Sequence, residues 1–309
     1  MALSDILRDK IRLLESARER LSDSVRQTEE EIFDSLMTQL ISLGVTEGNF
    51  EPTEDNLALL DEISDTLLQT ITSSDLAQNV TQTVLNDTAE VEDLVFQAYD
   101  EDNNDIAAAP LRELLDNTVD VDEARFIRKV IDGVTNEAVI SQNLLLPIRE
   151  QLFDSIVNGE SVTEVRRKLR TLIVSEEGVN SNLLSYVSQL SRDALSQYEG
   201  ARQDRIRKEF SLDGLIYLGT QIETTRPWCC AMLHARSIPL KSASARRKCD
   251  EIERALEDYH LGDGRYRVSD IQVFIDLGVG TSGFNENVTV DTFAQYRGGY
   301  ACRHSIMYI

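Results

Sequence analysis

The sequence is poor in residues that interrupt helices, because its 309 residues include only 5 prolines and 15 glycines. Aromatic residues make up only 6% of the chain, and tryptophan occurs once. Hydrophobic residues account for 41% and charged residues for 28%, a balance that indicates an ordered, helix-rich soluble protein and excludes a disordered chain. A chain of this length has room for two domains, each with its own core.

Long hydrophobic runs are also missing. No run approaches the roughly 20 apolar residues that a membrane-spanning helix needs. The first residues alternate in charge, with Asp5, Arg8, Asp9 and Lys10 where a secretory signal would need an apolar stretch. We therefore expect no membrane association, and a protein that is made in a cytosol and either stays there or is packaged from it.

Basic residues are scarce in the first two thirds of the chain. Residues 201–309 contain 15 Lys and Arg against 14 Asp and Glu. The whole chain has 31 basic and 54 acidic residues, so residues 1–200 contain 16 basic and 40 acidic ones. The net charges are therefore +1 and −24 for the two parts. An acidic surface repels phosphate backbones, so broad DNA binding by residues 1–200 is excluded without a local basic patch.

Residues 1–40 are expected to form one long helix. Apolar positions recur every three or four residues with two polar interruptions, a coiled-coil-like stripe made of Leu7, Ile11, Leu14, Arg18, Leu21, Val25, Thr28 and Ile32. Ser4 is the expected N-cap and Gly44 the expected C-terminal stop. The stripe fits packing within its own domain as well as a partner helix, and it makes this segment the candidate for homo-oligomer formation.

Similar spacing predicts further helices at about 54–72, 75–86, 89–99, 110–117, 122–140, 147–157, 162–174 and 181–210. The acidic stretch 100–105 is the expected interruption. It resembles a calcium loop at its first ligand positions, but Asp105 and Leu111 stand where such a loop needs Gly and Glu, so calcium binding is rejected.

The composition changes after residue 210. Residues 215–218 and 265–275 are rich in β-branched and aromatic residues and predict strands, with a helix between them at about 241–259. The predicted fold class is a mainly α N-terminal region with a small α+β C-terminal module. The expected domains are an acidic helical region, 1–145, and a second domain, 146–309, made of helices 147–210 and the α+β module 211–309.

Motifs of catalysis are missing. The sequence has no Gly-x-Ser-x-Gly, no Walker lysine loop and no His-Glu-x-x-His. Residues 278–283 match the Gly-x-Gly-x-x-Gly pattern after a predicted strand. Phe284 and the residues after it do not begin a helix pattern, however, so we interpret the glycines as a flexible loop. The sequence predicts that the protein is not an enzyme.

Two C-terminal segments carry a resemblance to a known family. In the first, a predicted strand and a short polar turn lead into Thr225, Arg226, Pro227, Trp228, Cys229 and Cys230; the second is Cys302-Arg303-His304. With the upstream segment 159–169 and the helix around Tyr198, they resemble the Mu F-like head morphogenesis family, which includes minor head proteins of tailed phages. The resemblance spans about residues 147–309. Glu223 or Gln221 stands where the family usually has Asp, and a family histidine before the last cysteine is missing.

The resemblance implies a structural virion component, a minor capsid protein that acts at the portal vertex during head morphogenesis. It would assemble in the host cytoplasm and then reside in the virion, with a portal or neck protein and other virion proteins as partners. The family-motif residues Glu223, Thr225, Arg226, Pro227, Trp228, Cys302 and Arg303 are the implied docking element. Two alternatives stay open: a portal-proximal neck or ring protein, and a helical toxin or transferase fused to a head-morphogenesis-like module.

All four cysteines and all three histidines lie in the last 81 residues of the sequence. Cys230 and His234 are four residues apart, and Cys302 and His304 two apart, so these four side chains could close on one zinc ion. The alternative is a small core that uses Cys as a buried apolar side chain, and disulfides are the least expected state in a reducing cytosol.

Two basic clusters could contact packaged DNA weakly or bind an acidic partner. The first comprises Arg202, Arg205, Arg207 and Lys208, and the second Arg246, Arg247 and Lys248. The alternative for both is a solvated helix face.

Overall fold

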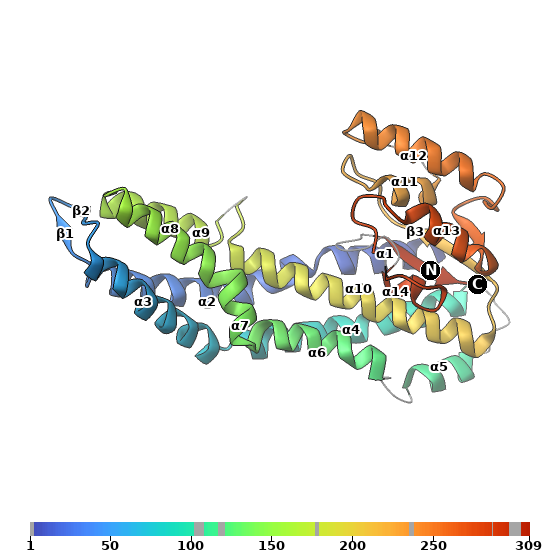
Figure 1. Ribbon diagram of the computed structural model, residues 1–309. Helices are drawn as coiled ribbons and strands as arrows, with labels where there is room; N and C mark the ends of the chain where they lie inside the picture. The colour runs from blue at the N-terminus through green and yellow to red at the C-terminus, as the bar shows by residue number, and fades with distance from the viewer. Residues whose placement is uncertain are drawn as a thin grey trace. The chain divides into compact units, whose positions relative to one another are not determined.

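The computed structural model describes residues 3–101, 108–116, 121–176, 179–234, 238–285, 287–296 and 304–309. These residues form a mainly α-helical protein with a small three-stranded sheet in the C-terminal third, which confirms the predicted fold class (Figure 1). The acidic interruption predicted at 100–105 lies largely outside the described residues, because α4 (Leu76–Glu101) ends at its second position.

The chain divides into two compact units. The first unit comprises Met1–Ser16, Asn86–Ile127 and Arg192–Ile309, and the second comprises Ala17–Leu85 and Arg128–Ser191. This division differs from the boundary at residue 145 that the sequence indicated. The physical reason is that α4, α6 (Val121–Thr135) and α10 (Asn182–Phe210) each continue from one unit into the other, so no linker composition marks the boundary.

The second unit is a helical assembly. Its α2 (Ala17–Leu40) packs on α3 (Glu54–Ser73) and α9 (Val162–Ile173), and α8 (Leu146–Val157) packs on both α3 and α9 (Figure 1). The helix α3 begins at the N-cap Thr53 and buries an apolar stripe made of Leu60, Ile63, Leu67 and Ile71. A two-stranded hairpin, β1 (Val45–Thr46) and β2 (Asn49–Phe50), connects α2 to α3.

A glutamate lies fully buried in this second unit. Glu29 accepts hydrogen bonds from the backbone N of Ser175 at 2.8 Å, from the hydroxyl of Ser175 at 2.9 Å, and from the hydroxyl of Ser181. A buried carboxylate needs such donors because it has lost its water. Glu29 therefore ties α2 to the connection between α9 and α10.

The N-terminal segment forms two helices, α1 (Leu3–Glu15) and α2, instead of the predicted single one. The break at Ser16 coincides with the boundary between the units. The helix α1 begins before Ser4, and α2 ends before Gly44, so neither of the predicted caps acts as one. The described members of the stripe are all buried, namely Ile11, Leu14, Leu21, Val25, Thr28 and Ile32. These six described side chains are therefore part of the core, and a homo-oligomer through this segment stays a prediction.

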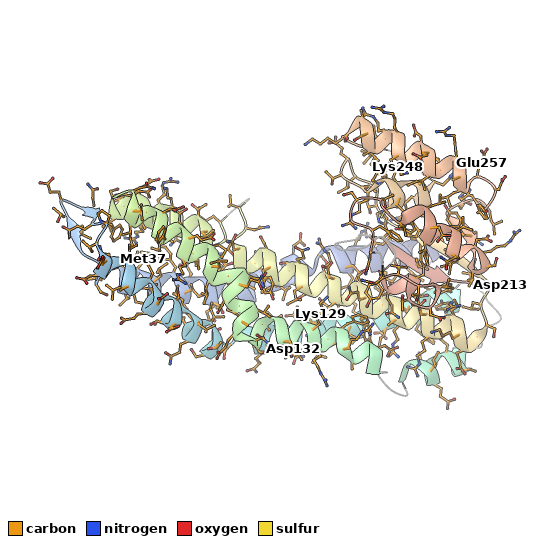
Figure 2. All side chains as sticks on the ribbon, in the orientation of Figure 1. Met37, Lys129, Asp132, Asp213, Lys248 and Glu257 are labelled. Carbon is orange, nitrogen blue, oxygen red and sulfur yellow. The ribbon has the colours of Figure 1, made fainter. Side chains whose placement is uncertain are left out.

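In the first unit, β3 (Gly214–Leu218) is the central strand of an antiparallel sheet of order β4-β3-β5. Leu215 pairs with Tyr266 of β4 (Arg265–Arg267) on one side and with Tyr308 of β5 (Ser305–Tyr308) on the other. Asp213, labelled in Figure 2, precedes β3, and its carbonyl accepts a hydrogen bond from Val268 at 2.7 Å.

The strand predicted at 265–275 is wrong beyond Arg267. The chain forms a 3-10 turn over Val268–Asp270 and then the helix α13 (Ile271–Gly278). Composition favours a strand here, but burial of Ile271, Phe274 and Ile275 follows helical spacing. The glycine-rich segment 278–283 therefore begins at the last residue of a helix and not after a strand. Two of its glycines make space for side chains, because a Cβ on Gly278 would lie 2.4 Å from the ring of Phe284 and one on Gly283 would lie 2.5 Å from Nε of Arg226.

Buried charges hold α10 in the first unit. Lys10 and Glu199 are 1% and 0% exposed and form an ion pair of 2.9 Å. Arg202, 2% exposed, pairs with Glu92 and with the buried Glu123 at 3.1 Å. Close packing adds to these contacts: a Cβ on Gly200 would lie 2.3 Å from the carbonyl oxygen of Ala294, so only glycine lets that backbone approach.

Candidate functional site

The first of the two segments that carry the family resemblance begins in β3 of the small sheet, and the described residue of the second, His304, lies directly before β5. His304, directly before β5, is buried and stacks on Tyr217 of β3 with ring centroids 5.4 Å apart. Gly219, directly after β3, makes this possible, since a Cβ there would lie 2.0 Å from Cδ2 of His304. The imidazole is thus a packed part of the core of the first unit.

The turn after β3 is fixed by short local contacts. The backbone N of Ile222 donates to the hydroxyl of Thr225 at 2.8 Å, and the backbone N of Lys241 donates to the carbonyl of Glu223 at 2.8 Å. Thr225 is buried, whereas the side chain of Glu223 is exposed. The turn therefore presents Glu223 to solvent on a rigid backbone.

The helix α11 (Pro227–Leu233) follows this turn and forms the centre of the module. Arg226 is the N-cap of this helix and Pro227 its first residue. Proline suits this position because the backbone N–H that it lacks would have no partner within the helix. Trp228 is 1% exposed, and its Nε1 donates to the carbonyl of Phe274 at 2.8 Å. Trp228 is therefore a core residue.

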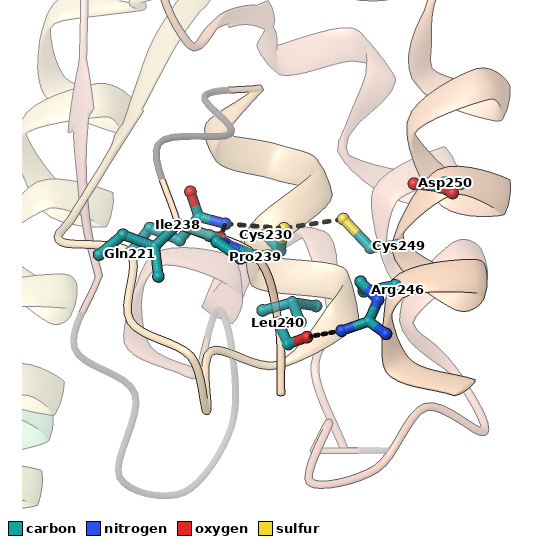
Figure 3. A pocket seen from close by; sticks show the side chains of 8 residues that line it. All are labelled: Gln221, Cys230, Ile238, Pro239, Leu240, Arg246, Cys249 and Asp250. Atoms are coloured by element: carbon teal, nitrogen blue, oxygen red, sulfur yellow. Dashed lines mark hydrogen bonds between the residues drawn. The ribbon is translucent and has the colours of Figure 1, made fainter. Parts of the chain in front are cut away.

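A pocket of about 230 Å³ opens between α11 and α12 (Ala243–Leu256) (Figure 3). It is lined by Gln221, Cys230, Ile238, Pro239, Leu240, Arg246, Cys249 and Asp250. The thiol of Cys249 donates to the sulfur of Cys230 at 2.8 Å, and Nε2 of Gln221 lies 3.4 Å from the same sulfur. Gln221 also donates to the carbonyl of Ile238 at 2.7 Å, which orients its amide.

A guanidinium borders the other side of the pocket. Arg246 donates through NH1 to the carbonyl of Leu240 at 2.6 Å, which ties the start of α12 to the loop before it. Asp250 lies one turn further along α12 and also lines the pocket. The site therefore combines two thiols, one amide, one cation and one carboxylate around an apolar floor.

The described members of the predicted zinc set have three different environments. The sulfur of Cys230 faces Cys249 and Gln221, His234 faces Glu253 and His260, and His304 stacks on Tyr217. Cys302 lies outside the described residues. Within the described part of the chain, no group of three or more His, Cys, Asp or Glu is placed to hold a metal ion.

His234 caps α11 in the left-handed conformation, at φ 49°. Its Nδ1 lies 3.5 Å from Oε1 of Glu253, and its ring stacks on His260 with centroids 3.9 Å apart. Burial lowers the pKa of His260, and the neighbouring His234 acts in the same direction. This arrangement joins the C-terminal end of α11 to α12 and to the start of the loop before β4.

The two basic clusters have different environments. Arg202 is in the core, which corrects its prediction as a surface contact, because its guanidinium neutralises two glutamates. Arg205 lies 3.8 Å from Glu123, while Arg207 and Lys208 lie 3.4 and 3.8 Å from the exposed Asp291. Arg246 and Arg247 are exposed, and Lys248, labelled on α12 in Figure 2, pairs with Glu251 at 3.0 Å. Arg246 and Arg247 of the second cluster and Lys208 of the first therefore keep exposed side chains.

Sequence reasoning missed Cys249 as a partner of Cys230. A signal was present, because Cys249, Ile252 and Leu256 follow the helical spacing of a buried face. Cys249 therefore had to face the core of the module, where Cys230 was also expected. Gln221 had no comparable signal, since a turn residue shows no periodicity.

The chain matches no protein-family model, no curated protein and no solved structure at a significant level. Of the helices that the structure describes, none has the length and apolarity needed to span a bilayer.

Proposed function

We propose that this protein is a structural component of a tailed-phage virion, a minor head protein that acts at the portal vertex during head morphogenesis. The observation that carries the proposal is the order of residues from β3 through the polar turn to Thr225, Arg226, Pro227 and Trp228, which resembles the Mu F-like head morphogenesis family. The packing of these residues into one rigid turn supports a role for them as a docking element.

The exposed part of this element is the turn itself. Trp228 and Thr225 are buried and hold the backbone, so a partner would meet Glu223 and its neighbour Thr224. Rim charges of this kind set the specificity and speed of association more than its strength. We therefore expect Glu223 to face a basic patch on the portal or on an adjacent neck protein.

The test is co-purification with the portal ring from the same phage. The variant Glu223→Lys reverses an exposed charge on the turn, and Asp276→Lys, an exposed position on α13, is the matched control. We expect Glu223→Lys to reduce binding by at least tenfold and to lower incorporation into procapsids, while Asp276→Lys leaves both unchanged. Both variants should keep the circular dichroism spectrum of the wild type.

Equal binding by wild type and Glu223→Lys would contradict the turn as the docking element. Association with an isolated neck complex but not with the portal would replace the minor head assignment by the neck or ring alternative. A protein that enters neither the procapsid nor the virion would overturn the proposal as a whole.

A further inference from the structure

Two cysteines from different helices of the C-terminal module lie in contact. Cys230 belongs to α11 and Cys249 to α12, and their sulfurs are 2.8 Å apart. The side chains are 3% and 2% exposed. The sulfurs of a disulfide lie about 2.05 Å apart, so this pair is within about 1 Å of bonding distance.

The surroundings of Cys230 favour the thiolate form of its sulfur. Its sulfur accepts from the thiol of Cys249 and faces the side-chain amide of Gln221, which is held in place by the carbonyl of Ile238. Donors directed at a sulfur stabilise negative charge on it, and the thiolate is the reactive form of cysteine. Cys249 is then the resolving thiol.

The pair is reachable by a small molecule. Both sulfurs belong to residues that line the pocket of about 230 Å³ (Figure 3), which is far larger than one peroxide molecule. Cys229, the sequence neighbour of Cys230, is equally buried but is not among the residues that line this pocket. An oxidant in the pocket would therefore reach Cys230 and not its neighbour Cys229.

We propose that Cys230 and Cys249 form an oxidation site that closes into an intramolecular disulfide when the protein meets a peroxide. The Cys230 thiolate attacks one oxygen of hydrogen peroxide, the O–O bond breaks, and hydroxide leaves to give a sulfenic acid on Cys230. The sulfur of Cys249 then attacks that sulfenic sulfur, the S–O bond breaks, and water leaves. Two thiols and one peroxide thus give one disulfide and two waters, so the cysteines are oxidised and the peroxide is reduced.

The disulfide links α11 to α12 across the pocket. It closes a loop of chain between residues 230 and 249 and so restricts the unfolded state. For a loop of this length we expect the oxidised protein to melt about 5–10 °C above the reduced protein. The inference does not rest on the proposed virion function, because it concerns only the chemistry of this pair.

The test uses the full-length protein, reduced and then treated with hydrogen peroxide. The wild type should lose two titratable thiols and the mass of two hydrogen atoms, and a reductant should restore both. Peptide mapping should find the peptide that begins at Cys249 linked to the peptide that contains Cys229 and Cys230. Melting curves of the oxidised and reduced forms give the shift in Tm.

Cysteine variants identify the partners. Cys230→Ser and Cys249→Ser should each abolish the link and the shift in Tm, whereas the matched controls Cys229→Ser and Cys302→Ser should keep both. Each comparison is between two redox forms of one variant, so a change in the stability of the variant itself does not obscure it. If Cys230→Ser or Cys249→Ser fails to fold, the linked peptides of the Cys229→Ser control still identify the pair, because Cys230 is then the one cysteine in its peptide.

Three results would overturn the proposal. The first is a link that joins Cys229 or Cys302 instead. The second is a sulfinic acid on Cys230 with Cys249 still reduced. The third is a metal ion on the two sulfurs of the purified protein that a chelator must remove before peroxide reacts, since the pair would then be a ligand set.

Discussion

Asp204 is a carboxylic acid in the core of the first unit. Tyr308 donates a hydrogen bond to its Oδ1 at 2.9 Å, and Gln295 donates to Oδ2 at 3.4 Å. Burial raises the pKa of Asp204 to about 7, and the hydrogen bond from Tyr308 offsets this only in part. In the unfolded chain the same group titrates near pH 4.

The raised pKa of Asp204 makes stability depend on pH. Between about pH 4 and pH 7 the folded protein keeps a proton that the unfolded chain loses, so the contribution of Asp204 to stability falls as the pH rises through this window. We expect Asp204→Asn to remove this loss. Urea titrations give the free energy of unfolding of both proteins at each pH. The stability of the wild type relative to the variant should fall by about 1–2 kcal/mol from pH 5 to pH 7.5.

The exposed Asp276→Asn, measured in the same way, should show no such trend. A difference between wild type and Asp204→Asn that is constant over pH would mean that Asp204 is ionised throughout, contrary to its burial.

Arg202 gives a second prediction, because it compensates a buried charge. Replacement of Arg202 by Met keeps the apolar part of the side chain but removes its positive charge. Glu123, which is 1% exposed, then keeps Arg205 as a cation at 3.8 Å. Loss of one partner from a buried pair costs about 3–5 kcal/mol. Chemical denaturation should show a loss of that order for Arg202→Met.

The control is Arg149→Met, which removes a 50% exposed partner of Asp61 and should cost less than about 1 kcal/mol. Similar losses in both variants would contradict the core role of Arg202.

At the scale of elements, the predicted helices agree best with the structure where spacing and caps point the same way. For α9, the sequence predicted 162–174, and Ser161 caps the helix by accepting from the backbone N of Glu164 at 3.3 Å. Residues 75–86 and 89–99 were predicted as two helices, with Asp87 and Thr88 between them. They form one helix, α4, in which these two polar residues are buried and have partners. The polarity of a single residue does not reveal that it will be buried with a partner inside a continuous helix.

The cap of α9 can be tested directly. Ser161→Ala removes the acceptor for an N-terminal N–H, and we expect a loss of about 1 kcal/mol in stability. Thr171→Ala, at an exposed position inside the same helix, should be neutral or slightly stabilising, since alanine favours helices more than threonine does. Hydrogen exchange should become faster in the first turn of α9 for Ser161→Ala only. Unchanged exchange there would show that packing alone fixes this helix end.

The candidate site was predictable in part for similar reasons. Thr225, Arg226 and Trp228 stand out as a motif, and the buried spacing of α12 points Cys249 toward the core. The pairing of Cys230 with Cys249 depends on how α11 packs on α12, which a single sequence does not encode in any local pattern. Among the described members of the predicted zinc set, each imidazole has an aromatic or carboxylate neighbour of its own, and zinc binding stays a prediction.

At the scale of the whole molecule, each unit is assembled from segments that are distant in the sequence. The first unit takes α1 from the start of the chain, part of α4 and α6 from its middle, and the sheet from its end. A fragment of residues 146–309 therefore lacks Lys10, Glu92 and Glu123, the partners of Glu199 and Arg202. The composition change that suggested an independent C-terminal domain does not coincide with the boundary between these two units.

We accordingly expect fragment 146–309 to be unfolded or aggregated, because buried charges without partners oppose folding. Circular dichroism and hydrogen exchange would show weak helicity and no protected amides. Co-expression with residues 1–145 should restore a soluble complex with helical content close to that of the intact protein. A fragment that folds alone with a protected sheet would contradict the division into these two units.

The ion pair between Lys10 and Glu199 also has a consequence for synthesis, because its partners are 189 positions apart. At about 5–20 residues per second, the ribosome takes roughly 10–40 s to make the chain between them. During that interval Ile6, Ile11, Leu13 and Leu14 of α1 have emerged without the core that later covers them. The nascent chain thus carries an exposed apolar helix through much of translation, and α1 is the segment where we expect a holding chaperone to bind.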